Sequence, residues 1–239
     1  MNKKQIDKLI LLFFILAVLS LFYPPIDNFL EQTFSATQTV FVERAIDGDT
    51  IETEIGNIRL LGINTPERGE IYYNEAKAFL ESRIFNKTVE LEFVGERIDK
   101  YNRTLAYVFL DDKNVNIEMV EKGYANYYFY DGRDKYSNKL EDAWNKCIDD
   151  EINLCEPSSN ICKSCININN DYLINNCNFS CNITNWTIKG EGREKFVFNK
   201  TLAQNQQASF ELDLTDSSGS LFLMDNEGKL VLWKRYSSI

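Results

Sequence analysis

Histidine is absent from the entire 239-residue sequence. Its absence excludes Ser-His-Asp and Cys-His nucleophilic arrangements, zinc hydrolases that hold their metal through imidazole, and metal nucleases that depend on a histidine. Any catalysis must therefore use carboxylates, Arg, Lys, Tyr or a metal ion.

Positive charge is also scarce. The chain carries 26 Lys and Arg residues against 36 Asp and Glu residues, which gives a formal net charge of -10. Proteins that bind nucleic acid tightly and without specificity do so largely through Lys and Arg, which replace the counterions of the phosphates. A broad basic surface is therefore not expected here. Any affinity for phosphates must come from a local group of cations on an acidic body.

Long apolar runs are confined to the N-terminus. The uncharged run Leu9–Tyr23 follows three lysines and ends at a pair of prolines. Such a run predicts a signal anchor or a signal peptide over residues 1–26, with a linker over residues 27–38. No small-x-small cleavage site directly follows the run, which favours an uncleaved anchor over a cleaved signal or a buried core helix. Because the lysines place the N-terminus in the cytoplasm, we expect the rest to be extracytoplasmic, either membrane-anchored or secreted.

All six cysteines lie between Cys147 and Cys181. An even number of cysteines in an exported chain favours disulfides. The pairs Cys162-x-x-Cys165 and Cys177-x3-Cys181 also match a four-thiolate zinc site, which stays open as the alternative. The sequence does not fix which cysteines pair.

Three short stretches carry the chemistry. They are Asp47-Gly48-Asp49-Thr50, then Arg59 followed by Asn64-Thr65-Pro66-Glu67, and finally Asp99-Lys100-Tyr101-Asn102-Arg103. Together they supply hard oxygen ligands for a divalent cation, one carboxylate that can handle a water proton, and two guanidinium groups that suit a phosphate. Asp49, Asn64 and the Thr65 carbonyl are the candidate ligands of a calcium-type ion. Pro66 fixes the backbone just before Glu67, which gives that carboxylate a defined direction.

At these residues the chain resembles the staphylococcal nuclease family, over roughly residues 39–150. The resemblance implies a calcium-dependent phosphodiesterase. It implies that Glu67 is the general base that orients a water, while Arg59 and Arg103 stabilise the developing charge of the phosphate. Lys100 and Tyr101 are further candidates, for contact with a terminal phosphate or a base of the substrate.

The chain departs from the family pattern at two positions. Asn64 stands where the family has a second aspartate, which keeps an oxygen ligand but removes one negative charge. We therefore expect weaker cation binding than at a two-aspartate site. Asn102 stands where the family has glycine, and asparagine is one of the residues that tolerates a left-handed backbone.

The apolar pattern of residues 39–150 predicts five strands and three helices. Strands are expected at 40–46, 50–55, 58–63, 89–94 and 105–110, and helices at 73–85, 114–123 and 136–149. The first hairpin is expected to turn at Gly56-Asn57, and Asn114 or Asn116 is expected to cap the second helix. This outline fits an α+β, OB-fold-like five-stranded barrel with helices, which is the fold that the resemblance implies.

The remaining residues divide into a Cys-rich linker at 151–170 and a β-rich segment at 171–239. Short apolar runs separated by glycines predict a small all-β sandwich in the second segment. The stretches Cys181–Ile188 and Asp225–Val231 resemble the lamin tail domain, which implies an immunoglobulin-like fold. An unrelated β module is the alternative.

We therefore expect a sequence-nonspecific endonuclease that cleaves DNA and RNA outside the cytoplasm. The alternative is a catalytically silent nucleic-acid-binding or surface-adhesion protein on the same folds. The C-terminal β domain is expected to bind a surface or polymer, by analogy alone, and the N-terminal segment to contact the membrane. The oligomeric state does not follow from the sequence.

Overall fold

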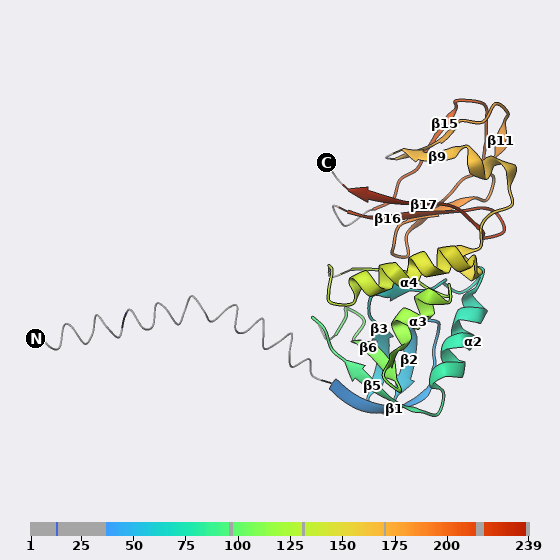
Figure 1. The fold of residues 1–239 in the computed structure, drawn as a ribbon. Coiled ribbons are helices and arrows are strands. Elements are labelled where there is room, and N and C mark those ends of the chain that lie inside the picture. The colour runs from blue at the N-terminus through green and yellow to red at the C-terminus, as the bar shows by residue number, and fades with distance from the viewer. Residues whose placement is uncertain are drawn as a thin grey trace, which may run out of the picture. The chain divides into compact units, whose positions relative to one another are not determined.

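A computed structural model describes Phe13 and residues 37–95, 98–130, 132–169, 171–213 and 218–237. Apart from Phe13, the predicted anchor or signal peptide lies outside the described residues, as does nearly all of the predicted linker at 27–38. Within the described ranges, no helix combines the length and the apolar character needed to cross a membrane. Residues Gln38–Ile239 form one compact unit (Figure 1).

Five strands of this unit close into a barrel. They follow the order β3-β2-β1-β5-β6, and the parallel pairing of β3 with β6 joins the two ends of the sheet. The strands are β1 (Thr37–Ala45), β2 (Thr50–Thr53), β3 (Gly56–Leu60), β5 (Thr88–Glu92) and β6 (Thr104–Leu110). The predicted OB-fold-like five-stranded barrel is thus confirmed.

The turn between β2 and β3 differs from the prediction. Thr53 pairs with Gly56, so the turn residues are Glu54 and Ile55 rather than Gly56-Asn57. Gly56 is the first residue of β3 and has a φ of 113°, a backbone angle that glycine adopts without steric cost. The glycine therefore marks the exit from the turn and not its centre.

Three helices pack with the barrel, at almost the predicted positions. They are α2 (Tyr73–Ile84), α3 (Val115–Glu121) and α4 (Ser137–Asp150). Asn114, which with Lys113 forms the short strand β7 (Lys113–Asn114), is the cap of α3, because its side chain accepts a hydrogen bond from the Ile117 amide. On α4, Leu140, Ala143 and Trp144 form the buried face, as the apolar spacing predicted.

A two-residue strand fixes the position of Asn64 in the second motif. β4 (Ile63–Asn64) pairs antiparallel with β8 (Asn126–Tyr127), so that Asn64 lies opposite Asn126. Both asparagines are buried. The metal-ligand candidate Asn64 is therefore held by a backbone ladder and not by a mobile loop.

The C-terminal half consists of β-sheets, as predicted, although its lamin-tail-like assignment stays a prediction. The first part of this half, predicted to be a linker, contains two short 3-10 helices, η1 (Asn153–Cys155) and η2 (Ile161–Ser164), and the strand β9 (Ile166–Asn169). Sheets form in the orders β15-β10-β9, β11-β14 and β13-β12-β16-β17. The other strands are β10 (Tyr172–Asn175), β11 (Cys181–Asn182), β12 (Thr187–Lys189), β13 (Lys195–Val197), β14 (Thr201–Leu202), β15 (Gln207–Ser209), β16 (Ser218–Met224) and β17 (Leu230–Ser237).

Strand β16 is buried on both faces and belongs to two cores. Leu221 and Leu223 pack into the core of the C-terminal sheets. Phe222 and Met224 point to the opposite face and belong to the core of the barrel. In Figure 1, β16 and β17 lie next to α4, where the Phe222 and Trp144 rings meet edge to face with centroids 5.0 Å apart. The two halves therefore share a layer of structure.

All six cysteines form disulfides. The pairs are Cys147–Cys155, Cys162–Cys181 and Cys165–Cys177. The first bridge ties the end of α4 to η1, and the other two fix η2 to the start of the C-terminal sheets. The four cysteines of the zinc alternative are thus the ones that form the two neighbouring bridges.

Peptide mapping of the exported, non-reduced protein is expected to recover these three pairs. To separate the two neighbouring bridges, the digestion must cut both between Cys162 and Cys165, for example after Lys163, and between Cys177 and Cys181, for example after Phe179. Zinc content should be measured on the same sample. Six free thiols, or stoichiometric zinc with no disulfide, would contradict the disulfide assignment.

Candidate active site

The first motif forms a tight turn against the end of β4. A Cβ atom on Gly48 would lie only 2.8–2.9 Å from side-chain atoms of Thr65, so only glycine allows this approach. The approach brings the Asp49 carboxylate onto Thr65, whose amide and hydroxyl donate to Oδ2 at 3.1 and 3.0 Å. Asp49 and Thr65 are both buried. Two predicted ligand residues from separate motifs are therefore in direct contact.

Arg59 forms a buried ion pair with Asp49. Its Nη2 atom lies 3.0 Å from Asp49 Oδ2. The same guanidinium donates to the carbonyls of Leu60 and Ile63 at 2.8 Å each, and more weakly to that of Asp49 at 3.4 Å. Most N–H groups of Arg59 are thus engaged within the protein, and the side chain is held rigidly.

The amide of Asn64 has one satisfied end and one unsatisfied end. Its Nδ2 donates to the carbonyl of Gly192 at 3.1 Å, which fixes the direction of the amide because a carbonyl only accepts. Its Oδ1 is buried and accepts no hydrogen bond from any described residue. A buried oxygen without a donor is costly unless something else satisfies it. A cation held by oxygen ligands would do so.

Asp47 adds a second carboxylate beside Asp49. Its Oδ1 accepts a hydrogen bond from the Asp49 amide at 3.1 Å. Burial, followed by the nearby charge of Asp49, raises the pKa of Asp47 above its usual value. Two carboxylates this close repel each other when both are ionised, and a bound cation would offset that repulsion. The residues present therefore fit a divalent metal ion.

Arg103 is positioned by Asp99, a residue of the third motif to which sequence reasoning gave no role. The Asp99 carboxylate accepts from the amides of Tyr101 and Arg103 at 2.9 Å each and pairs with the Arg103 guanidinium at 2.7 Å. Partial burial raises the pKa of Asp99, but these hydrogen bonds outweigh burial and leave its pKa below the usual value. Asn102 has a φ of 61°, which confirms the left-handed backbone expected there.

The two motif arginines lie around the same carboxylate. Arg103 Nη1 lies 3.5 Å from the Thr50 hydroxyl, and that hydroxyl donates to Asp49 at 3.2 Å. Burial is the main cause of a lowered pKa at Arg59; the charge of Asp49 opposes it, and the charges of Arg103 and Arg193 add to it. The structure therefore brings Asp49, Arg59 and Arg103 together as predicted, and adds a third arginine that was not predicted.

Glu67 lies at the edge of this cluster. Its amide donates to Glu70 Oε2 at 2.8 Å, and its Oε1 forms an ion pair of 2.6 Å with Nε of Arg193. The Glu67 side chain is 46% exposed. Its described ion-pair partner thus comes from the C-terminal half of the chain.

Lys100 and Tyr101 lie at the surface beside Arg103. Tyr101 is 63% exposed, and the Arg103 guanidinium carbon lies 5.3 Å from its ring centroid. Lys100 Nζ lies 5.2 Å from the same centroid. Both side chains are accessible to a bound polymer, although no buried contact fixes them in one direction.

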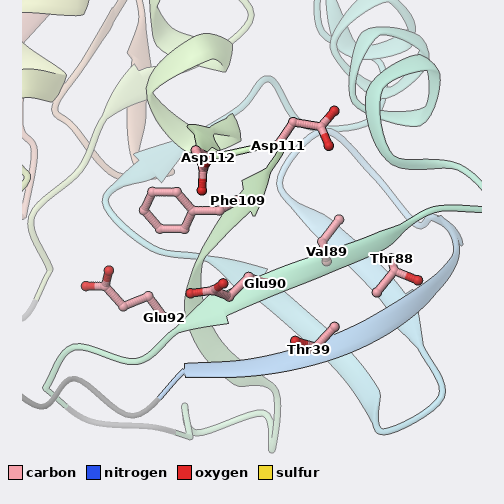
Figure 2. A pocket seen from close by; sticks show the side chains of 8 residues that line it. All are labelled: Thr39, Thr88, Val89, Glu90, Glu92, Phe109, Asp111 and Asp112. Atoms are coloured by element: carbon pink, nitrogen blue, oxygen red, sulfur yellow. The ribbon is translucent and has the colours of Figure 1, made fainter.

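Two hollows in the surface differ in the charge of the residues that line them. One of about 420 Å³ lies on the outside of β1, β5 and β6 and contains none of the predicted site residues (Figure 2). Its lining includes four carboxylates, of Glu90, Glu92, Asp111 and Asp112, which would repel a phosphate. Another, of about 540 Å³, is lined by residues that follow Glu67 in the chain, with the cations Arg68 and Lys77 and the carboxylate of Glu70, and it also contains none of the predicted site residues. Of these two hollows, the second includes cations and is next to the candidate site through Glu70, which accepts from the Glu67 amide.

Comparison with known proteins gives consistent matches. A family model described as staphylococcal nuclease homologue matches residues 57–155, which include Arg59, Glu67 and Arg103. A thermonuclease of Staphylococcus intermedius is 35% identical over 129 residues, 50% of this chain and 77% of that protein. A thermonuclease of Staphylococcus hyicus is 36% identical over 116 residues, 44% of this chain and 69% of that protein. An SPbeta prophage-derived endonuclease of Bacillus subtilis is 33% identical over 114 residues, 43% of this chain and 38% of that protein.

Proposed function

Because the chain belongs to the staphylococcal nuclease family, we propose that it is a calcium-dependent endonuclease that cleaves DNA and RNA with little sequence preference. The coarser activity, hydrolysis of phosphodiester bonds by a nuclease, follows from the family. The observation that supports the proposal best is the unsatisfied Oδ1 of Asn64 beside the Asp49–Arg59 ion pair. Action outside the cytoplasm is part of the proposal and is supported by the disulfides.

Asp49, Asn64 and the Thr65 carbonyl would hold the calcium ion, with Asp47 next to them. Carboxylate, amide and backbone oxygens are the ligands that calcium prefers. When bound, the ion supplies positive charge that polarises the phosphodiester and offsets the negative charge that develops during hydrolysis.

The other residues divide the reaction between proton transfer and charge stabilisation. Glu67 accepts the proton of the attacking water, and its half-exposed position leaves room for that water. Arg103, held by Asp99, binds the phosphate and stabilises its developing charge. Arg59 contributes its fixed charge, and the phosphate competes with Asp49 for its N–H groups. Lys100 and Tyr101 contact the nucleotides next to the cleaved bond.

Hydrolysis of single-stranded DNA and RNA by the purified full chain tests this proposal. Cleavage is expected with calcium and should stop when a chelator removes the ion. Magnesium in place of calcium tests the choice of metal. Binding of the polymer without any cleavage under these conditions would instead support the catalytically silent alternative.

Asn64→Asp is expected to lower the calcium concentration that gives half-maximal DNA cleavage. The substitution restores one negative charge at direct-contact distance from the ion. In the unmodified chain, the carbonyl of Gly192 accepts a hydrogen bond from the Asn64 side-chain amide. The substitution replaces this donor with a carboxylate oxygen, which the carbonyl repels. We therefore expect a lower melting temperature without calcium and a larger gain on calcium addition, measured by thermal unfolding beside the calcium titration.

Asn167→Asp on β9 is the matched control, because it adds the same charge at an exposed position of the C-terminal half. It should leave the half-maximal calcium concentration unchanged. An unchanged or higher value for Asn64→Asp would show that the ion is not held at Asn64.

Two expected partners stay predictions. The membrane contact depends on the N-terminal segment outside the described residues. A surface or polymer partner for the C-terminal half rests on analogy, and we propose it only as an additional role. The described contacts indicate a closer role for this half, at the active site itself.

A further inference from the structure

The loop at residues 190–194, between β12 and β13, contacts the candidate active site although it belongs to the C-terminal half. The Gly192 carbonyl accepts from Asn64, and Arg193 pairs with Glu67. The loop thus contacts the predicted metal ligand Asn64 through a backbone carbonyl and the predicted general base Glu67 through a guanidinium group. These residues are more than a hundred positions apart in the sequence, so the contact is a property of the fold.

Polar contacts, part-buried at one end and exposed at the other, fix both ends of this loop to the barrel. Lys189 donates to Asn126 Oδ1 at 2.8 Å, and Asn126 Nδ2 donates to the Glu191 carbonyl at 2.8 Å. Burial lowers the pKa of Lys189 to about 8. On the far side, Lys195 forms an ion pair with Glu70. The loop is therefore attached to β8 and to the segment after Glu67.

The sheet behind the loop is also attached to the barrel. Trp233 of β17 donates to the Tyr127 hydroxyl at 3.1 Å, and that hydroxyl bonds to Ser220 of β16 at 2.5 Å. Together with the shared layer at β16, these contacts hold β12 and β13 at a fixed distance from β4 and β8. The position of Arg193 relative to Glu67 is therefore set by packed secondary structure.

Arg193 differs from the two motif arginines in its accessibility. Arg59 is buried and gives most of its N–H groups to the protein. Arg193 is 47% exposed, and Glu67 is its only described ion-pair partner. A half-exposed ion pair of this kind is weak and exchanges partners easily. The planar guanidinium suits two oxygens of a phosphate group.

We infer that Arg193 is a third phosphate-binding, catalytic arginine, supplied to the nuclease site by the C-terminal half. This inference rests on the proposed function of the same site. Without substrate, Arg193 pairs with Glu67. When a DNA or RNA strand binds, Arg193 transfers to the two non-bridging oxygens of the cleaved phosphodiester, and Glu67 is released to accept the proton of water. The substrate strand then lies between the barrel and the 190–194 loop.

Kinetics of full-length Arg193→Ala on single-stranded DNA test this role. We expect kcat/KM to fall roughly 10- to 100-fold, the range for a lost hydrogen bond to a charged group. Arg193→Lys should recover part of the loss in KM, because charge remains, and less of the loss in kcat, because the two-oxygen contact does not. Thermal unfolding should change little, since the pair is half-exposed.

Arg235→Ala is the matched control. It removes the same side chain from the same half of the protein, where Arg235 is exposed and pairs with Glu141 on α4. Its kcat and KM should equal those of the unmodified chain. An Arg193→Ala variant that is unchanged or faster would overturn the inference, and a faster one would show that the loop inhibits the site.

A binding measurement separates this inference from the proposed function. In a Glu67→Gln background, Arg193 has lost its anionic partner and hydrolysis is suppressed. Adding Arg193→Ala should weaken binding of a short fluorescent single-stranded DNA, followed by anisotropy, roughly tenfold or more. Equal affinities of Glu67→Gln with and without Arg193→Ala would overturn the inference. If the unmodified chain does not hydrolyse DNA but Arg193→Ala still weakens DNA binding, the proposed function is contradicted and this inference is not.

Discussion

Replacing Arg103 with alanine, or Glu67 with glutamine, is expected to lower the turnover of DNA by about 10²- to 10³-fold or more, since each change removes a group that acts mainly in the transition state. Arg103→Ala removes a charge that Asp99 holds beside Thr50. Glu67→Gln removes the acceptor of the water proton. Single-turnover cleavage of a labelled oligonucleotide at saturating calcium measures both effects without a contribution from product release.

Arg44→Ala is the control for loss of an arginine from the barrel. Arg44 is exposed on β1, where it pairs with Glu52 of β2, so its removal should leave turnover and melting temperature nearly unchanged. Rates close to that of the unmodified chain for Arg103→Ala and Glu67→Gln, with the fold intact, would remove both residues from the catalytic assignment.

Asp49→Asn is expected to affect both activity and stability. The carboxylate holds Arg59 in a buried ion pair, and removing one partner of such a pair leaves an uncompensated charge at a cost of about 3–5 kcal/mol. The same change leaves almost no charge on the direct ligands of the ion, so activity should nearly vanish at moderate calcium. Urea unfolding and calcium titration of cleavage measure the two effects separately.

Asp47→Asn is the matched comparison for this variant. Asp47 is only partly buried, and its described hydrogen bond is to a backbone amide, which an asparagine oxygen can also accept. We therefore expect a much smaller loss of stability together with weaker calcium binding. Full activity of Asp49→Asn at moderate calcium would mean that the ion is not held by the first motif.

The parts of the fold that the sequence predicted are those with local signals. The helices and barrel strands follow from apolar periodicity, and the left-handed backbone of Asn102 follows from its place at a glycine position of the family pattern. The turn before β3 was predicted two residues late, because a glycine with positive φ marks either the centre or the exit of a turn. The pairing register of β2 with β3 decides between these two positions, and the residue types of the turn do not.

The parts that were missed depend on contacts distant in sequence. No local pattern links Glu67 to Arg193 or Asn64 to Gly192, since these pairs form only when the C-terminal sheets pack on the barrel. One signal was present, however. The unbroken apolar run Leu221–Met224 lacks the polar alternation of a strand with one exposed face, and it predicts burial on both sides. The cysteine pairing likewise depends on how η2 meets β11.

The shared strand β16 has a consequence for biosynthesis. A ribosome makes the barrel sequence first, and an independent domain would fold as soon as it emerged. Here Phe222 and Met224 complete the core of the barrel, and they are translated well after α4, the last helix that packs on it. The newly made nuclease is therefore expected to become competent only after β16 has left the ribosome, so that a barrel sequence made without β16 stays inactive.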